Sequence, residues 1–82
     1  MKEYSLGELV LPCPSPVGWS MCTQPNVSSI CHDLIWNSYM NMTGTVLEIH
    51  DAPYLRFYKI VTSRGQIGWL ISSSIMKVSN SH

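Results

Sequence analysis

Three cysteines and a histidine are the side chains in the first half of this chain that suit a metal ion. Cys13, Cys22, Cys31 and His32 would offer thiolates and an imidazole, which zinc prefers. Structural zinc sites usually take two ligands from positions two to four residues apart, whereas eight residues separate each of these cysteines from the next. The spacing therefore favours small buried or half-buried thiols, and we expect no metal and no cofactor.

The same cysteines bear on nucleophilic chemistry and on disulfides. A cysteine hydrolase needs a thiolate, a base and an orienting group, which Cys22 or Cys31 with His50 and Asp51 would supply on paper. Nothing in the sequence brings these residues together, and a domain this small rarely holds a deep pocket. We therefore expect no enzymatic activity. Because three is an odd number, at least one thiol should be free, and no disulfide framework is indicated.

Aromatic and basic residues alternate around residues 54–59. In an extended strand, Tyr54, Arg56 and Tyr58 share one face while Phe57 and Lys59 share the other. A platform for single-stranded nucleic acid requires this interleaving. Aromatic pairs edged by an Arg or a Lys also stabilise ordinary sheets, and this interpretation is favoured.

Charge gives little support to nucleic-acid binding. The chain of 82 residues has five basic and five acidic residues, hence a formal net charge of +0, and only 12% of its residues are charged. A neutral chain has no general attraction for a phosphate backbone. A nucleic-acid interface at Arg56, Lys59 and Arg64 is therefore the alternative to protein binding.

The second half of the chain has the pattern of an antiparallel sheet. Apolar and polar residues alternate from Thr45 to His50, and Pro53 ends that strand. Gly65 closes a short polar turn that is typical of a hairpin. The serines at 72–74 favour a turn or a single 3₁₀ turn. We expect strands at 45–50, 55–62, 66–71 and 75–78, with Ile67, Trp69 and Ile71 on one face.

The first half is richer in proline and less regular. A first strand is expected at 6–11, stopped by Pro12, followed by a long irregular region over 12–43. Apolar pairs four residues apart allow a short helix between about Ser29 and Met40, and a second hairpin fits nearly as well. We treat residues 1–82 as one domain.

Several segments of the second half resemble SH3 domains. Residues 44–49 (GTVLEI) are similar to an SH3 strand, residues 57–60 (FYKI) to its aromatic strand, and residues 65–70 (GQIGWL) with the serines and Ile75 to its ending. Residues 7–10 (GELV) resemble the strand that opens small stand-alone SH3-like proteins of bacteriophages. The resemblance implies a mainly β fold, a small SH3-like antiparallel barrel with its sheet at 44–78, and a phage or bacterial origin.

The resemblance is weaker where SH3 domains bind polyproline. Their groove uses aromatic residues of the first strand, yet Leu9 to Pro12 contains none. Ile71 stands where the family has its groove proline, Ser74 where it has a tyrosine, and Phe57 where it has its first groove tryptophan. The resemblance therefore implies the barrel without implying a polyproline ligand. Cell-wall binding, typical of bacterial SH3 domains on secreted hydrolases, is not favoured either.

These observations predict a non-enzymatic protein-interaction or structural module. The expected contact residues are the aromatic residues Tyr54, Phe57 and Tyr58, with Trp36 as a further candidate. Trp69 is expected in the core or at its rim, while Trp19 and Trp36 are expected to cap the barrel. Self-association through strand edges fits as well. No apolar targeting or membrane segment is visible, so we expect no membrane partner and a cytoplasmic location, in a host cytoplasm or a virion.

Overall fold

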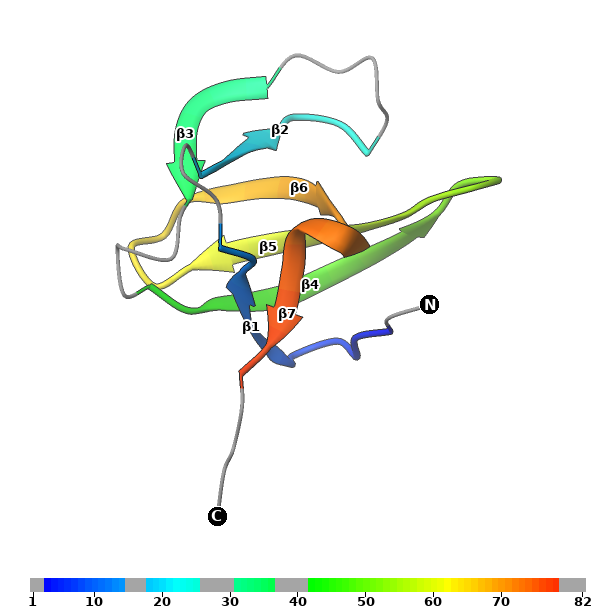
Figure 1. The fold of residues 1–82 in the computed structure, drawn as a ribbon, viewed down its shortest axis with the longest axis horizontal. Helices are drawn as coiled ribbons and strands as arrows, with labels where there is room; N and C mark the ends of the chain where they lie inside the picture. Colours follow the sequence, from blue (N-terminus) through cyan, green and yellow to red (C-terminus); the bar gives the residue numbers. More distant parts are fainter. Residues whose placement is uncertain (1–2, 15–17, 26–30, 37–41, 79–82) are drawn as a thin grey trace.

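The fold is a single antiparallel sheet that curls strongly into a half-barrel (Figure 1). The computed structural model describes residues 3–14, 18–25, 31–36 and 42–78. The elements are β1 (Leu9–Pro12), β2 (Trp19–Cys22), β3 (Cys31–Trp36), β4 (Gly44–Asp51), β5 (Arg56–Thr62), β6 (Ile67–Ile71), the 3₁₀ turn η2 (Ser72–Ser74) and β7 (Ile75–Lys77).

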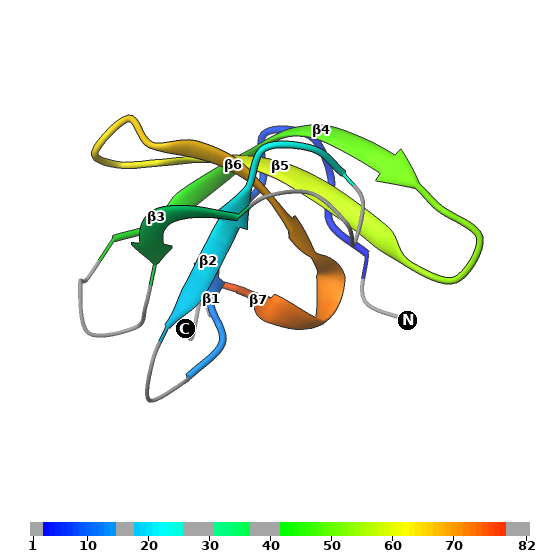
Figure 2. The same ribbon diagram turned by 90° about the horizontal axis from the view of Figure 1, so that it is seen from above.

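The order of strands across the sheet is β3-β2-β6-β5-β4-β1-β7. The last strand of the chain pairs with the first, because β7 returns beside β1 (Figure 1). Seen from above, the β4–β5 hairpin extends beyond the rest of the sheet (Figure 2). The outer strands of this order are β3 and β7.

The three-stranded meander of β4, β5 and β6 confirms the strands expected from residue alternation. Val46 pairs with Ile60, and Ile60 pairs with Gly68, so one inward row crosses all three strands. Gly65 has φ +85 in the β5–β6 turn, a backbone conformation that glycine adopts easily. A break in register between Val46 and Glu48 marks a bulge that the alternation did not indicate.

The first strand differs slightly from its expected bounds. β1 begins at Leu9 and includes Pro12, which pairs with Ile75 of β7. Proline is tolerated there because β4 pairs with β1 only at Leu9 and Val10. β1 pairs with β4 through its first two residues and with β7 through its last three, so the sheet bends between β4 and β7.

The irregular first half contains a hairpin, which was one of the two structures its spacing allowed. β2 pairs with β3 through Trp19 opposite Trp36 and Cys22 opposite Cys31. The helix considered for about 29–40 is wrong over Cys31–Trp36, because those residues form a strand; the remaining positions lie outside the described residues. β2 also joins the main sheet, with Cys22 opposite Trp69 of β6.

The core lies on the inner face of the curl. Trp36 is fully buried, and its indole N–H donates to the Met42 carbonyl at 3.0 Å. A β-carbon at Gly44 would lie 3.0 Å from the Trp36 ring, so glycine leaves space for this indole. The other members of this core are Tyr4, Val10, Met21, Met42, Val46, Tyr58, Ile60, Leu70 and Ile75. Phe57 is also buried, at 5% exposure, but on the opposite, outer face of β5.

Trp69, which was expected in the core or at its rim, lies on the outer face of the sheet instead. It is half-buried and pairs with Lys59, on the face opposite the buried Tyr58 and Ile60. Ile67 and Ile71 share that outer face, as expected from their spacing. The outer face of the meander is therefore rich in apolar side chains. Within the described part of the chain, no helix is long and apolar enough to span a bilayer.

Candidate functional site

The outer face of the sheet is hollowed on either side of Phe57. One hollow, of about 240 Å³, lies between β2, β5, β6 and η2, and the other, of about 310 Å³, lies beside the β4–β5 turn. Both are lined mainly by apolar side chains, and Phe57 belongs to the lining of each, so we call the two neighbouring hollows together the Phe57 groove. Its lining residues are Trp19, Ser20, Cys22, Pro25, His50, Ala52, Pro53, Tyr54, Leu55, Phe57, Trp69, Leu70, Ile71 and Ser74.

The floor of the groove comes from three neighbouring strands. Phe57 on β5 is opposite His50 on β4 and Ile71 on β6. The His50 ring centroid lies 6.4 Å from that of Phe57 and 6.4 Å from that of Trp69. Residues directly opposite one another in a sheet point the same way, which brings these rings together on one face. The floor therefore presents aromatic surface.

The β2 strand forms one wall. Met21 points into the core, so its neighbours Ser20 and Cys22 point outward to the groove. The indole N–H of Trp19 donates to the Cys13 carbonyl at 2.8 Å, which fixes the ring at the end of this wall. The wall is thus held by the core on one side and by a hydrogen bond at its end.

The β4–β5 turn forms the opposite wall. The amide of Ala52 donates to the Leu55 carbonyl at 2.8 Å and closes the turn. Pro53 restricts its backbone further. Tyr54, at the tip, is 95% exposed and offers a whole aromatic ring to the solvent. An exposed ring beside an apolar hollow is typical of a contact surface.

The expected partner-binding residues separate into two pairs. Tyr54 and Phe57 line the groove. Tyr58 and Trp36 are fully buried in the core, where the Tyr58 hydroxyl accepts a hydrogen bond from the Tyr4 amide at 3.1 Å. Burial removes Tyr58 and Trp36 from any contact surface, so we leave them out of the proposed site.

Several groove residues were not singled out as contact residues from the sequence. His50, Trp69 and Ile71 lie opposite or beside Phe57, and their positions depend on which strands are neighbours. The alternation did place Trp69 and Ile71 on one face of their strand. The missing information was that this face and the Phe57 face are the same.

The basic residues do not form one surface. Arg56 pairs with Asp51 at 2.5 Å and with Glu3 at 3.3 Å, and its hydrogen bond to Asp51 raises the pKa of the guanidinium. Lys59 pairs with Glu48 at 3.0 Å on the other face of β5. Arg64 is exposed in the β5–β6 turn. Cations that are already ion-paired and lie on opposite faces do not form the single basic surface that binds a phosphate backbone.

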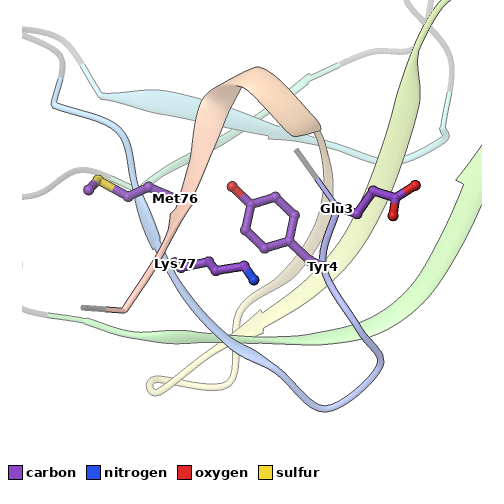
Figure 3. Close-up of a pocket in the computed structure, with 4 residues that line it drawn as sticks. All are labelled: Glu3, Tyr4, Met76 and Lys77. Carbon is purple, nitrogen blue, oxygen red and sulfur yellow. The ribbon is translucent and has the colours of Figure 1, made fainter. Parts of the chain in front are cut away.

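A hollow of about 410 Å³ lies between the N-terminal segment and β7 (Figure 3). Figure 3 shows the Tyr4 ring between Glu3 and the β7 residues Met76 and Lys77. The Tyr4 hydroxyl donates to the Ile75 carbonyl at 2.9 Å, and Lys77 lies 3.8 Å from Glu8. Burial, followed by the charges of Cys13, Tyr58 and Glu8, raises the pKa of Tyr4. These polar groups serve the fold, so the Phe57 groove is the stronger site.

The cysteines differ from the three thiols that were expected. Cys13 is free and donates from Sγ to the Ser73 carbonyl at 3.5 Å, which agrees with at least one free thiol. Cys22 is disulfide-bonded, which corrects the expectation of a thiol there. His50 and Asp51 are consecutive in β4 and point to opposite faces. Among the described residues, no three His, Cys, Asp or Glu side chains come together as metal ligands would.

We compared the chain with protein-family models, with curated proteins and with solved structures. None of the three comparisons found a match.

Proposed function

We propose that this chain is a non-enzymatic SH3-like module that binds an extended, apolar segment of a protein partner in the Phe57 groove. One observation carries the proposal. The resemblance to SH3 domains matched Phe57, Ile71 and Ser74 to three groove positions of that family. All three line the same hollow, although they come from β5, β6 and η2.

The path of the chain supports the SH3-like assignment. The meander β4–β6 is followed by a 3₁₀ turn, and β7 then returns to pair with β1. This return extends the curled sheet by one strand beyond β1, and strong curling of one antiparallel sheet is what a small barrel is built from. The strong curl of the sheet therefore supports the SH3-like proposal.

The lining of the groove supports an apolar ligand. Aromatic rings from Trp19, Phe57 and Trp69 provide large apolar surfaces, and Tyr54 adds a ring at the rim. Aromatic anchors contribute much of the energy in peptide and protein interfaces. Ile71 and Ser74 in place of a proline and a tyrosine leave the groove without the residues that grip polyproline. We therefore expect a ligand with apolar or aromatic anchor residues and few charges.

A displayed library of random peptides, selected on the full chain, tests this proposal. Affinities of the selected peptides are then measured for Ile71→Glu and for a matched control, Ile67→Glu. Both isoleucines lie on the outer face of β6, but only Ile71 lines the groove. We expect Ile71→Glu to weaken binding by about tenfold or more, because a charge would be desolvated on contact.

The control and a stability measurement separate binding from folding. Ile67 is 47% exposed, so Ile67→Glu should keep the affinity within about twofold. A milder variant, Ile71→Ser, serves if Ile71→Glu fails to fold. Equal losses for the Ile67 and Ile71 variants, or no peptide enriched over scrambled sequences, would count against the groove.

A further inference from the structure

Cys22 lies at the junction between β6 of the main sheet and the β2–β3 hairpin, which forms one wall of the Phe57 groove. It is opposite Cys31 in the β2–β3 pairing and opposite Trp69 in the β2–β6 pairing. Cys22 is disulfide-bonded, the chain has three cysteines, and Cys13 is free. We infer that Cys22 is bonded to Cys31 and that this disulfide is a redox switch in the wall of the Phe57 groove. While the bond is intact, it holds β2 and β3 together. We call this disulfide the latch.

The register fits such a bond. Residues directly opposite each other in an antiparallel pair have Cα atoms about 4.5 to 5.5 Å apart. Disulfides join residues whose Cα atoms are about 4.4 to 6.8 Å apart. The pairing of Cys22 with Cys31 therefore needs no movement of the two backbones. The bond would join the last residue of β2 to the first residue of β3.

The latch matters for the groove because the β2–β3 hairpin pairs with the main sheet over a short length. β2 has four residues, and its register with β6 is a single pair, Cys22 with Trp69. Met21 packs against Gly68 at the same place. A cross-link that keeps β2 and β3 together limits the fraying of this wall. Since Cys22 itself lines the groove, loss of the cross-link would change the wall where a peptide would lie.

The chemistry of the latch is thiol–disulfide exchange. A dithiol reductant gives two electrons and two protons, its own sulfurs become a disulfide, and Cys22 and Cys31 become thiols. Oxidised glutathione reverses the reaction and leaves as two thiols. Disulfides persist in oxidising compartments and open in the reducing cytoplasm. This inference rests on the proposed function, and it predicts a groove that binds its ligand more tightly in an oxidising environment.

A thiol count tests the pairing. Unfolded under non-reducing conditions, the chain should react with one equivalent of a maleimide, at Cys13, and with three after reduction. Peptide mapping should join the segments that hold Cys22 and Cys31. A linkage through Cys13, or three reactive thiols in protein kept from reductants, would overturn the pairing.

Amide hydrogen exchange tests the latch without any ligand. Oxidised and reduced protein are compared in a Cys13→Ser background, which prevents disulfide reshuffling. We expect reduction to speed exchange at least about tenfold at Met21 and Cys22, with the β4–β5 amides unchanged. The variant Cys31→Ser should match the reduced protein. Equal exchange in both states overturns the latch.

The coupling to binding is measured with a library-selected peptide. Its affinity should fall about tenfold on reduction of the Cys13→Ser protein, and an unchanged affinity overturns the coupling. If the library yields no peptide for either state, the proposed function fails, while the exchange rates still decide the latch.

Discussion

Gly68 of β6 lies directly against Met21 of β2, so closely that a β-carbon on Gly68 would collide with the Met21 side chain. Gly68 pairs with Ile60 in the middle of the meander, and Met21 is fully buried. This contact packs the β2–β3 hairpin against β6 of the main sheet. It also puts Ser20 and Cys22, the neighbours of Met21, at the groove.

The substitution Gly68→Ala should therefore destabilise the chain and loosen one wall of the groove. The added methyl must displace Met21, which we expect to lower the free energy of unfolding by about 1 to 3 kcal/mol. Urea denaturation measures this loss, and hydrogen exchange should show it concentrated in β2. A stability equal to that of the original chain would contradict the close contact.

Gly65→Ala is the matched control for this glycine. Open space surrounds a β-carbon at Gly65, but its φ of +85 is unfavourable for alanine. We expect a loss of about 1 to 2 kcal/mol from backbone strain alone. The exchange rates of the β2 amides should rise only as much as the loss of global stability raises exchange rates elsewhere in the sheet. If Gly65→Ala also speeds exchange selectively in β2, the effect of Gly68→Ala cannot be assigned to displacement of Met21.

Tyr58→Phe tests the buried hydrogen bond between the N-terminal segment and the core. The Tyr58 hydroxyl accepts from the Tyr4 amide at 3.1 Å, and the two rings meet edge to face with centroids 5.1 Å apart. Phenylalanine keeps the ring contact but leaves the buried amide without this acceptor, at a cost of about 1 to 3 kcal/mol. The control Tyr54→Phe, on a ring that is 95% exposed, should change stability by less than about 0.5 kcal/mol. Similar losses for both variants would contradict this account.

Stability should fall at alkaline pH because of Tyr4. Burial, with smaller contributions from Cys13, Tyr58 and Glu8, raises the pKa of Tyr4 above its ordinary value of 10.0. Below about pH 9 this group is protonated in both the folded and the unfolded chain and adds no pH dependence. As the pH rises through 10, the unfolded chain loses this proton first, so the free energy of unfolding decreases.

Urea denaturation between pH 8 and 11 measures that decrease, and Tyr4→Phe is the comparison. Phenylalanine cannot ionise, so the variant should lose less stability over this interval. Parallel curves for the two proteins would show that Tyr4 does not contribute.

Binding to single-stranded nucleic acid should be weak and depend little on the cations first considered. Arg56 and Lys59 are ion-paired and point to opposite faces of β5. Fluorescence anisotropy with a labelled oligothymidine at low salt should show no saturable binding. Tight binding that Arg64→Ala or Lys59→Ala abolishes would favour the nucleic-acid alternative.

Residue alternation was enough to predict the meander. The strands from Gly44 to Ile71 are long, and Gly65 marks their tightest turn. Period-two alternation predicts these strands but not the face that β4 buries, because Leu47 and Ile49 are exposed and the bulge between Val46 and Glu48 shifts the register. The 3₁₀ turn at Ser72–Ser74 followed from its three hydroxyl side chains.

Local patterns allowed a hairpin in the first half but could not choose it over a helix, and they did not show which tryptophan is in the core. β2 has four residues, too few for a clear period, and it begins at Trp19 opposite Trp36 in a strand far along the chain. The space for the Trp36 ring is created by Gly44, which local patterns marked only as a strand start. The groove could not be predicted as a whole, because it depends on β2 reaching β6.

The most direct test of the proposed function is a chemical-shift map of the ¹⁵N-labelled chain with a library-selected peptide. We expect the largest changes at Phe57 and Ile71 and at the indole N–H groups of Trp19 and Trp69, all within the Phe57 groove. Changes centred instead on Leu9, Val61 and Ile67, the outward row at the other end of the sheet, would contradict it.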